Sequence, residues 1–302
     1  MRRLAWDGIE FDVPDNWDMA RYHCPSRLHT LLVIEDEYSI RMEVEWMQAP
    51  ALAKARRFTA RTTRALEALI ARADKRTPVQ ELPPGWSATH CEFSEILPAR
   101  RRDRKLGVVR HELITAIYAP EDSLLRGVVR LNFLPGDTEK PEPLLRDILS
   151  SFRWPGPHDG RVLWQVLDLS QEMNPDFRLE ATTFEIGSKL MVFRRGGRRL
   201  YCWTLSCADR IFTPGVNETE WIIGFLNGTR RVPGIMFQQG QGNGIGWRRR
   251  GLIAVVHRDE LARLCFRYVI GYRRRPERNQ IAAWVFNYHR QTDLQWLRDI
   301  IP

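Results

Sequence analysis

The two halves of this 302-residue chain carry the same short motifs in the same order. Each half opens with an apolar alternation that ends in a proline-containing turn, FDVPDNW at residues 11–17 and LDLSQEMNPDF at residues 167–177. Two strand-like runs around a polar centre follow, at residues 29–46 and 188–205, and the second pair has Gly-Gly at its turn, a strong hairpin signal. A pattern that returns at half the chain length predicts a tandem duplication.

Later motifs support the same duplication. The segment PPGWSATHCEFSEI enters a predicted strand at Trp86, and GIGWRRRGLIAVV does so at Trp247. Both halves finish on Leu-Arg-Asp-Ile, which starts at Leu145 and at Leu297. We therefore expect the halves to superpose as two antiparallel sheets, with Trp86 over Trp247 and Leu145 over Leu297.

The middle of each half contains the predicted helices. Residues 49–75 have Pro50 in the first turn and apolar side chains at helical spacing, which predicts one long amphipathic helix packed on a sheet. A basic amphipathic helix can also lie on a membrane. Core packing is favoured here because Phe58 is the only aromatic residue on the apolar face. In the second half, residues 216–228 predict a helix capped by Asn217.

These patterns together predict an α+β fold of two tandem domains, each an antiparallel β-sheet covered by helices. The first domain is expected at residues 1–154, with its long helix at about residues 50–75. Prolines and glycines predict a short stiff linker at residues 155–162. The second, duplicated and basic domain is expected at residues 163–302.

The glycine-rich stretch FQQGQGNGIGWRRRG, at residues 237–251, raises the question of a phosphate-binding loop. It has no Walker lysine followed by Ser or Thr, and Ile245 and Trp247 occupy the places where a GxGxxG motif needs its third glycine. By the internal alignment it corresponds to a plain connection, QELPPGW. We expect an exposed loop in which Gly240, Gly242 and Gly244 hold no nucleotide, the alternative being an anion-binding nest of backbone N–H groups.

No motif in the sequence points to catalysis, a cofactor or a metal. The five cysteines are odd in number and lack a CxxC spacing, and the seven histidines show no HxxxH or HxH pattern. No nucleophile elbow is present. No apolar run approaches the ~18 residues of a membrane span, and acidic residues interrupt the region where a signal peptide needs its apolar stretch. We therefore expect a cytoplasmic protein that is not an enzyme and that has neither cofactor nor metal.

Positive charge is concentrated in the second half of the chain. Residues 1–157 hold 24 Lys+Arg against 23 Asp+Glu, a net charge of +1, and residues 158–302 hold 22 against 14, a net charge of +8. Arginine outnumbers lysine by 41 to 5. Arginine suits bidentate contact with phosphate or carboxylate, but a GC-rich genome would produce the same excess.

Several arginine clusters stand at predicted strand ends beside aromatic residues, a mixture that is enriched in interface hot spots. The candidate partner-binding residues are Arg194, Arg195, Arg198, Arg199, Trp247, Arg248, Arg249, Arg250, Arg273, Arg274 and Arg275. We expect the triplets at 248–250 and 273–275 to lie near each other and to face an anionic partner. Three interpretations remain: solvated hairpin tips, a contact with an acidic protein surface, or a nucleic-acid contact.

The element order, with VPDNW near the start and LRDILSSF at the close of the first half, resembles the Mog1/PsbP/DcrB-like superfamily. The second half departs from it by having Asn-Pro-Asp-Phe in place of the Pro-x-x-Trp turn. The resemblance implies α+β domains that bind rather than catalyse, since its members include a Ran-binding factor, an extrinsic photosystem subunit, lipoproteins and paired secretion chaperones. We therefore predict a non-enzymatic protein-binding, scaffold or chaperone-type protein, an accessory factor or subunit of a larger assembly with an acidic partner. The alternative is a nucleic-acid-associated protein that binds through arginine-rich hairpin tips.

Overall fold

The structure is a computed structural model, and it describes residues 1–26, 29–97, 107–154, 161–229, 231–232, 246–247, 267–288 and 290–298. The chain divides into two compact units. Unit 1 comprises Met1–Gly156 with Gln165–Asp168, and unit 2 comprises Pro157–Trp164 with Leu169–Pro302.

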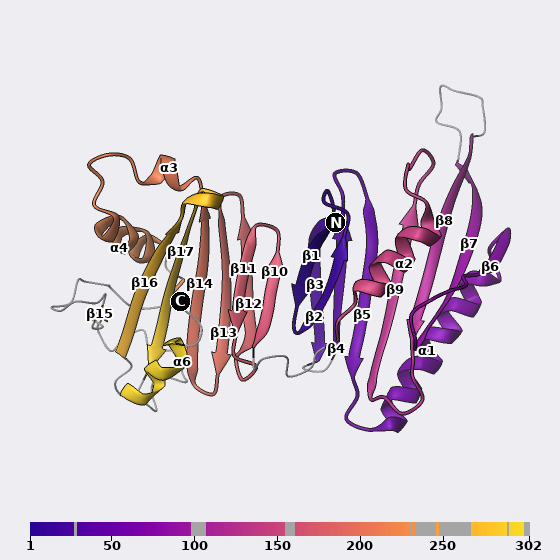
Figure 1. The fold of residues 1–302 in the computed structure, drawn as a ribbon, viewed down its shortest axis with the longest axis horizontal. Helices are drawn as coiled ribbons and strands as arrows, with labels where there is room; N and C mark the ends of the chain where they lie inside the picture. Colours follow the sequence, from indigo (N-terminus) through magenta and orange to yellow (C-terminus); the bar gives the residue numbers. More distant parts are fainter. Residues whose placement is uncertain are drawn as a thin grey trace. The chain divides into compact units, whose positions relative to one another are not determined.

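Seven antiparallel strands form the large sheet of unit 1 (Figure 1). Their order across the sheet is β3 (Asp18–Ser26), β4 (His29–Glu35), β5 (Ile40–Gln48), β9 (Leu125–Phe133), β8 (Gly107–Tyr118), β7 (Trp86–Leu97) and β6 (Lys75–Pro78). Neighbouring strands follow one another along the chain except at the centre, where β5 lies beside β9 with Val44 opposite Val129. Along β5 the buried Met42, Val44 and Trp46 alternate with glutamates, as the period of two in a strand requires.

Six antiparallel strands form the large sheet of unit 2. Their order is β12 (Arg178–Glu185), β13 (Ser188–Arg195), β14 (Arg198–Ser206), β17 (Gln280–Tyr288), β16 (Arg267–Arg275) and β15 (Gly246–Trp247). This order matches the order in unit 1 strand for strand, and within the described residues β6 alone has no counterpart. Trp86 is the first residue of β7, and Trp247 lies in the corresponding strand, β15.

A short hairpin stands at the beginning of each repeat. In unit 1 it joins β1 (Arg2–Trp6) to β2 (Ile9–Val13) through Asp7 and Gly8, both of which have positive φ values of 52° and 83° as a tight hairpin turn requires. The matching hairpin joins β10 (Val162–Val166) to β11 (Leu169–Met173). After each hairpin the chain makes the same kind of turn, closed by the Trp17 N–H donating to the Pro14 carbonyl at 3.0 Å and by the Phe177 N–H donating to the Asn174 carbonyl at 2.9 Å.

The predicted α+β architecture, with helices covering each sheet, is wrong. Strands hold 50% of the described residues and helices 23%, so the chain is a β-rich fold of mostly antiparallel sheets. The first half contains three strands that its sequence did not indicate, namely β1, β3 and β6, and the second half contains two, β10 and β12. The edge strands β3 and β12 alternate weakly between apolar and polar residues, as DMARYHCPS and RLEATTFE show, and this is why periodicity alone missed them.

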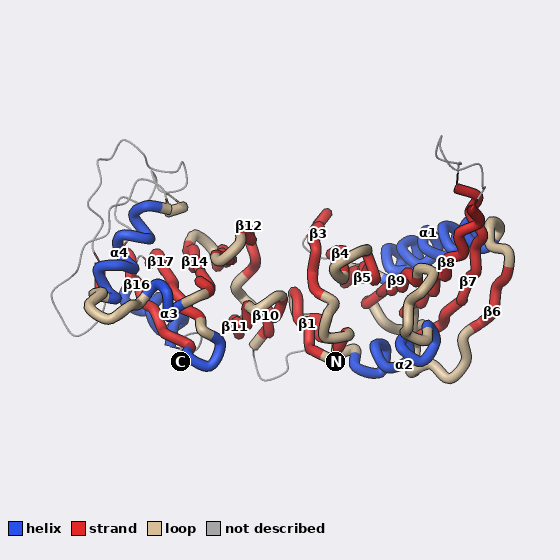
Figure 2. Tube along the Cα trace, turned by 90° about the horizontal axis from the view of Figure 1, so that it is seen from above, coloured by secondary structure: helices blue, strands red, loops and turns tan. Residues whose placement is uncertain are grey.

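Two helices lie on opposite faces of the seven-stranded sheet, as Figure 2 shows. Helix α1 (Leu52–Ile70) buries Ala55, Phe58 and Thr62, and His29 of β4 meets the Phe58 ring edge-on at 5.8 Å between ring centroids. Helix α2 (Pro141–Ser151) has proline in its first turn and buries four aliphatic side chains, Leu144, Leu145, Ile148 and Leu149.

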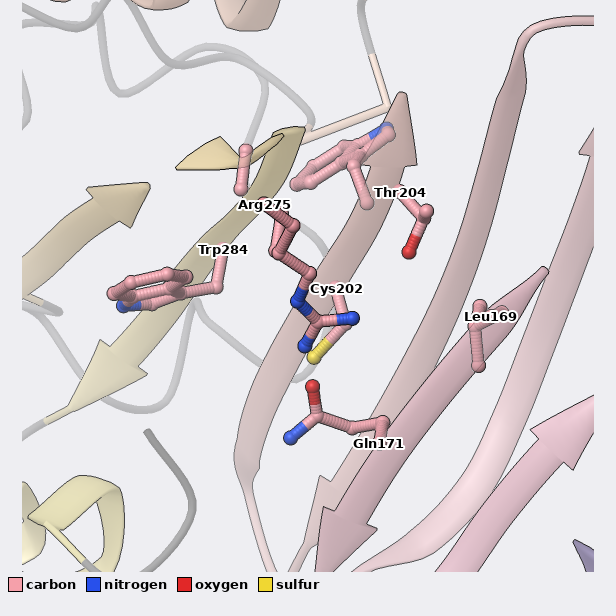
Figure 3. Close-up of a pocket in the computed structure, with 9 residues that line it drawn as sticks. Leu169, Gln171, Cys202, Thr204, Arg275 and Trp284 are labelled. Atoms are coloured by element: carbon pink, nitrogen blue, oxygen red, sulfur yellow. The ribbon is translucent and has the colours of Figure 1, made fainter. Parts of the chain in front are cut away.

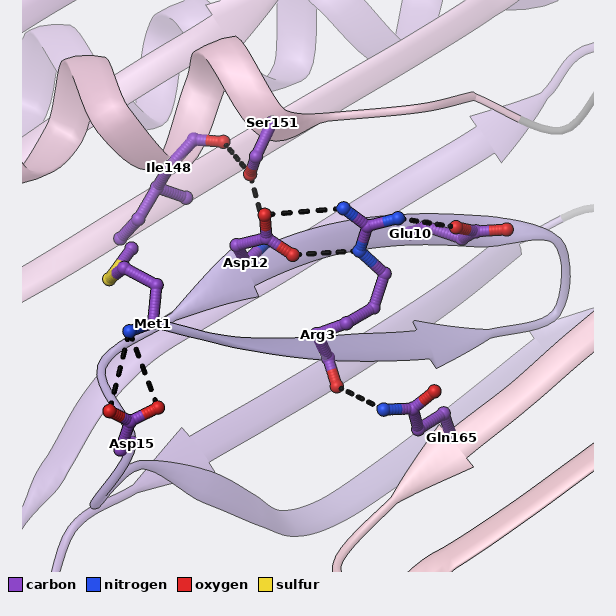
Figure 4. Close-up of polar contacts among 8 residues, drawn as sticks. All are labelled: Met1, Arg3, Glu10, Asp12, Asp15, Ile148, Ser151 and Gln165. Atoms are coloured by element: carbon purple, nitrogen blue, oxygen red, sulfur yellow. Dashed lines mark hydrogen bonds and ion pairs between the residues drawn. The ribbon is translucent and has the colours of Figure 1, made fainter.

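The β1–β2 hairpin is tied to the end of α2 by a polar network (Figure 4). The Arg3 guanidinium donates to the Asp12 carboxylate at 2.7 Å, and the Asp12 backbone N–H donates to the Ser151 hydroxyl at 2.8 Å. Ser151 in turn donates to the Ile148 carbonyl at 2.6 Å, one of the carbonyl groups that the end of a helix leaves without an intrahelical partner. The Arg3 hydrogen bond lowers the pKa of Asp12 below its usual value, so this tie stays charged at neutral pH.

Replacing Gly127 of β9 with alanine is expected to destabilise the protein by about 1–3 kcal/mol, the usual cost of overpacking. A methyl group there would lie 2.5 Å from the Trp154 ring, which is held by Tyr118 at 4.6 Å and stacks on Trp86 at 5.8 Å between centroids. Urea unfolding of the wild type, both single variants and Gly127→Ala with Trp154→Ala provides the test. In the Trp154→Ala background most of the cost should disappear; an unchanged cost there would show that the clash is not its cause.

Candidate functional site

The structure places the described arginine clusters at opposite ends of the six-stranded sheet. Residues 194–199 form the tip of the β13–β14 hairpin, where Arg195 is paired with Arg198 across the strands. Residues 273–275 lie at the opposite end of the strands, where Arg275 of β16 is paired with Gln280 of β17. These two clusters therefore do not combine into one surface.

Three other sequence predictions concern residues that the structure does not describe. Arg248, Arg249 and Arg250 lie outside the described residues, as do Gly240, Gly242 and Gly244 of the glycine-rich stretch. The expected proximity of residues 248–250 to residues 273–275 therefore stays a prediction. Of this region the structure describes the backbone of β15, in which Trp247 is paired with Tyr268.

The arginines of the β13–β14 tip are paired with carboxylates of their own unit. Arg199 makes a bidentate contact with Glu180 of β12, with N–O distances of 2.6 and 2.8 Å. The same carboxylate lies 3.8 Å from the Arg194 guanidinium. One glutamate thus serves two arginines across neighbouring strands.

The other two tip arginines fasten the C-terminal segment and the turn before β12. Arg198 donates to Asp293 at 2.6 Å, and both side chains are largely buried. Arg195 pairs with Asp176 at 2.6 Å, and its guanidinium lies 4.0 Å from the centroid of the Trp296 ring. Asp293 belongs to η3 (Gln291–Leu294) and Trp296 to α6 (Gln295–Arg298). The arginines of the tip therefore hold other parts of unit 2 in place, and these structural contacts explain why the tip is rich in arginine.

The end of β16 is different, because Arg275 enters a small pocket without a counter-ion among the described residues (Figure 3). Its half-buried guanidinium makes two long contacts to the Ser170 carbonyl, at 3.4 and 3.5 Å. No carboxylate in the described part of the chain lies within ion-pair distance of it. In Figure 3 the Arg275 guanidinium points toward the Cys202 thiol and the Gln171 side chain, and Trp284 lines the same pocket.

Strand register explains how this pocket is built on one face of the sheet. Cys202 of β14, Trp284 of β17 and Gly271 of β16 lie side by side across three strands. Alternation puts Arg273 and Arg275 on the same face as Gly271. The indole of Trp284 lies over Gly271, where an added Cβ would be 2.1 Å from the ring. The opposite face of the sheet carries a hydrophobic core that includes Ile222 of α4 (Glu218–Gly228).

The electrostatics of the pocket favour an anion and disfavour thiol chemistry. Burial lowers the pKa of Arg275 from its usual value, and the charges of Arg278 and Arg273 lower it further, with Glu277 opposing them in part. Arginine nevertheless stays charged at neutral pH. Burial raises the pKa of Cys202 to about 12, although Arg275 opposes this shift. The Cys202 thiol is therefore protonated and a poor nucleophile at neutral pH.

We call Arg273, Arg275, Gln171, Cys202 and Trp284 the β16 site. Sequence reasoning selected Arg273 and Arg275 but missed the other three, which come from β11, β14 and β17. The signal for these two arginines was the cluster Arg273-Arg274-Arg275 at a predicted strand end, next to Tyr272. Nothing local in the sequence brings Gln171 or Trp284 to them. Arg274 points to the other face, where it lies 4.0 Å from Glu218 of α4.

The described residues offer neither a metal-binding cluster nor a membrane-spanning helix. That part of the chain contains no group of three or more His, Cys, Asp or Glu side chains placed to hold a metal ion. It also contains no helix that is long and apolar enough to cross a membrane. Its four cysteines, Cys24, Cys91, Cys202 and Cys207, are free thiols.

Comparison with known proteins yields no family for this chain. No family model and no curated protein matches it. Among solved structures, it is similar to a crystal structure of a protein from Bacteroides thetaiotaomicron VPI-5482, with 8% sequence identity and a TM-score of 0.26. The match covers 52% of this chain and 49% of that protein, so it spans about half the length of either. A likeness this weak carries no argument, and the resemblance to the Mog1/PsbP/DcrB-like superfamily stays a prediction.

Proposed function

We propose that this chain is a non-enzymatic binding protein, a scaffold or accessory factor, which takes an acidic segment of a partner protein at the β16 site. The observation that carries the proposal is the half-buried Arg275 guanidinium with no carboxylate partner among the described residues. A charge that is withdrawn from water without a counter-ion costs free energy. A carboxylate from a partner would offset that cost through charge-assisted hydrogen bonds.

The contrast with the β13–β14 tip supports this placement. At the tip, Arg198 and Arg199 already have carboxylate partners at 2.6 Å, so a new anion would have to compete with Asp293 or Glu180. At the β16 site no such competitor from the described residues holds Arg275. Arg273 stands exposed on the same face, and Trp284 offers an apolar surface beside them. Arginine with tryptophan is the combination enriched in interface hot spots.

The chemistry of the pocket supports binding over catalysis. Its nucleophile candidate, Cys202, has a pKa raised to about 12. A thiol with that pKa presents almost no thiolate at neutral pH. What remains in the pocket is a cation, an amide side chain and an indole, which together bind and orient an anion.

Replacing Arg275 with glutamine is expected to weaken the binding of an acidic peptide by about tenfold or more, which corresponds to about 1.4 kcal/mol or more. The probe is a fluorescently labelled 12-residue peptide of Glu and Asp, followed by anisotropy with the full chain. The melting temperature should stay the same or rise, because the substitution removes a poorly compensated buried charge.

Arg199→Gln is the matched control, since it removes the same charge from a paired arginine of the same sheet. It should leave peptide binding unchanged and lower the melting temperature slightly, because the contact with Glu180 is lost. Failure of the wild-type chain to bind the peptide, or equal binding by wild type and Arg275→Gln, would overturn the proposal.

A further inference from the structure

The outward face of α1 carries a row of exposed cations. Five basic side chains of this helix are exposed, and the helix contains a single carboxylate, Glu67; the basic residues are Lys54, Arg56, Arg57, Arg61 and Arg64. The helix therefore has a net charge of +4, although the first half of the chain as a whole is nearly neutral. This surface belongs to unit 1 and is independent of the β16 site.

Within the described residues, only one of these cations has an ion-pair partner. Arg61 pairs with Glu45 of β5 at 2.6 Å, which fixes the helix to the sheet. For Lys54, Arg56, Arg57 and Arg64, no carboxylate in the described part of the chain lies within ion-pair distance. Their charges are thus available to a ligand.

Helical spacing arranges four of the cations in one stripe. Lys54, Arg57, Arg61 and Arg64 follow one another at intervals of three, four and three residues, which keeps them on one side of the helix. At 1.5 Å per residue the stripe is about 15 Å long. The exposed residues Ala53, Ala60 and Ala68 lie beside it, and their small side chains let another molecule approach closely.

The character of the face selects the class of partner. A helix that binds membranes inserts an apolar face, but the central part of the apolar face of α1 is packed on the sheet, since Ala55, Phe58 and Thr62 are at most 5% exposed. Protein interfaces gain most of their affinity from aromatic and arginine anchors in desolvated pockets, whereas this stripe is exposed and flanked by alanines. Evenly spaced cations on a smooth surface are sufficient for a phosphate backbone.

We infer that the outward face of α1 binds the phosphate backbone of duplex nucleic acid without sequence preference. The ligand is recognised by the spacing and sign of its charges, and no base contact is required. Because the stripe offers at most four cations, the contact is weak and strongly dependent on salt.

The test is fluorescence anisotropy of the full chain with two 20-base-pair DNA duplexes of unrelated sequence at 50–200 mM salt. Both duplexes should bind equally, and the logarithm of the binding constant should fall with the logarithm of salt concentration with a slope of about −2 to −4, or about −0.9 per phosphate neutralised. The double variant Arg57→Glu with Arg64→Glu should bind at least tenfold more weakly at 50 mM salt, with a slope shallower by about 2. The glutamate introduced at position 57 would lie one turn before Arg61, and an ion pair at that spacing stabilises a helix. Circular dichroism checks that the variant keeps the helix content of the wild type.

Arg178→Glu with Arg210→Glu is the charge-matched control, because both arginines are exposed and lie in unit 2. It should bind DNA nearly as well as the wild type. Three results would overturn the inference: no binding by the wild type, equal loss in both double variants, which would indicate a response to net charge alone, or binding to anionic phosphatidylserine vesicles without binding to DNA.

Discussion

Replacing Arg41 with methionine is expected to lower the free energy of unfolding by about 3–5 kcal/mol, the usual result of breaking a buried ion pair from one side. Arg41 of β5 donates through Nε to Asp36, in the β4–β5 turn, and through both Nη atoms to Asp137, in the turn after β9. The three side chains are only 9%, 4% and 14% exposed, in that order. Methionine preserves much of the packing volume but leaves two carboxylates buried without their cation.

Urea unfolding at pH 7 measures this loss, and Arg130→Met is the control. Arg130 also pairs with a carboxylate on the sheet, Glu43 at 3.2 Å, but both side chains are about 30% exposed. A pair of that kind contributes about 0–1 kcal/mol. Similar losses in the two variants would contradict the assignment of Arg41 as a buried anchor.

The same prediction has a dependence on pH. The Arg41 hydrogen bond lowers the pKa of Asp137 below its ordinary 3.8. Burial alone would raise the pKa of Asp36, but hydrogen bonds from the Tyr38 and Ser39 backbone N–H groups and from Arg41 outweigh burial and lower it. A carboxyl group whose pKa is lowered in the folded state adds stability above its unfolded pKa and loses it as the pH falls through the folded pKa. The wild type should therefore lose stability below about pH 4. In Arg41→Met protonation relieves the buried charges, so the gap between the two proteins should narrow below that pH; a constant gap from pH 7 to pH 3 would contradict this.

Replacing Phe11 with alanine should cost about 3–5 kcal/mol, as for other large-to-small changes in a core. Phe11 of β2 is completely buried, and its ring stacks on Phe152 at 4.8 Å between centroids. Phe152 in turn meets Trp86 and Trp154 at 5.4 and 5.3 Å. The cavity would therefore open where the β1–β2 hairpin, the end of α2 and β7 come together.

Two further variants show whether the loss of stability comes from the cavity at Phe11 or from aromatic substitution in general. Phe11→Leu should cost less than about 1.5 kcal/mol if the neighbours repack, and Tyr38→Ala, at a residue that is 88% exposed, should change stability by no more than about 0.5 kcal/mol. A loss below about 1 kcal/mol for Phe11→Ala would show that the β1–β2 hairpin contributes little to the core of unit 1.

Local features could be predicted from the sequence because their causes are local. Gly196 and Gly197 indicated a tight turn, and Arg195 faces Arg198 across that hairpin. Asn217 was predicted to cap a helix, and its side chain accepts hydrogen bonds from the Thr219 and Glu220 backbone N–H groups. In each case the determining residues lie within three positions of the feature.

Fold class and the β16 site depend on distant residues and could not be predicted in this way. The edge strands β3 and β12 are held by their neighbours β4 and β13 rather than by their own alternation. Whether an arginine is paired depends on which carboxylate the topology brings to it. Asp293 reaches Arg198 from 95 positions away, whereas nothing of the kind reaches Arg275 within the described residues. Two arginine clusters that look alike in the sequence thus differ in the fold.

The central pairing of β5 with β9 has a consequence for the order of folding. Strands β3 to β5 and β6 to β9 each form a meander of neighbours along the chain, whereas β5 and β9 meet only after a long loop has closed. Loop closure makes such a contact late and slow. Until then both meanders present an open edge, which invites pairing with the wrong chain. The exposed β5 edge carries Glu43, whose correct partner is Arg130 of β9. If the β5 edges of two molecules paired with each other, each would bring the negative charge of Glu43 to the contact. The Glu43–Arg130 pair therefore favours pairing of β5 with β9 of the same chain.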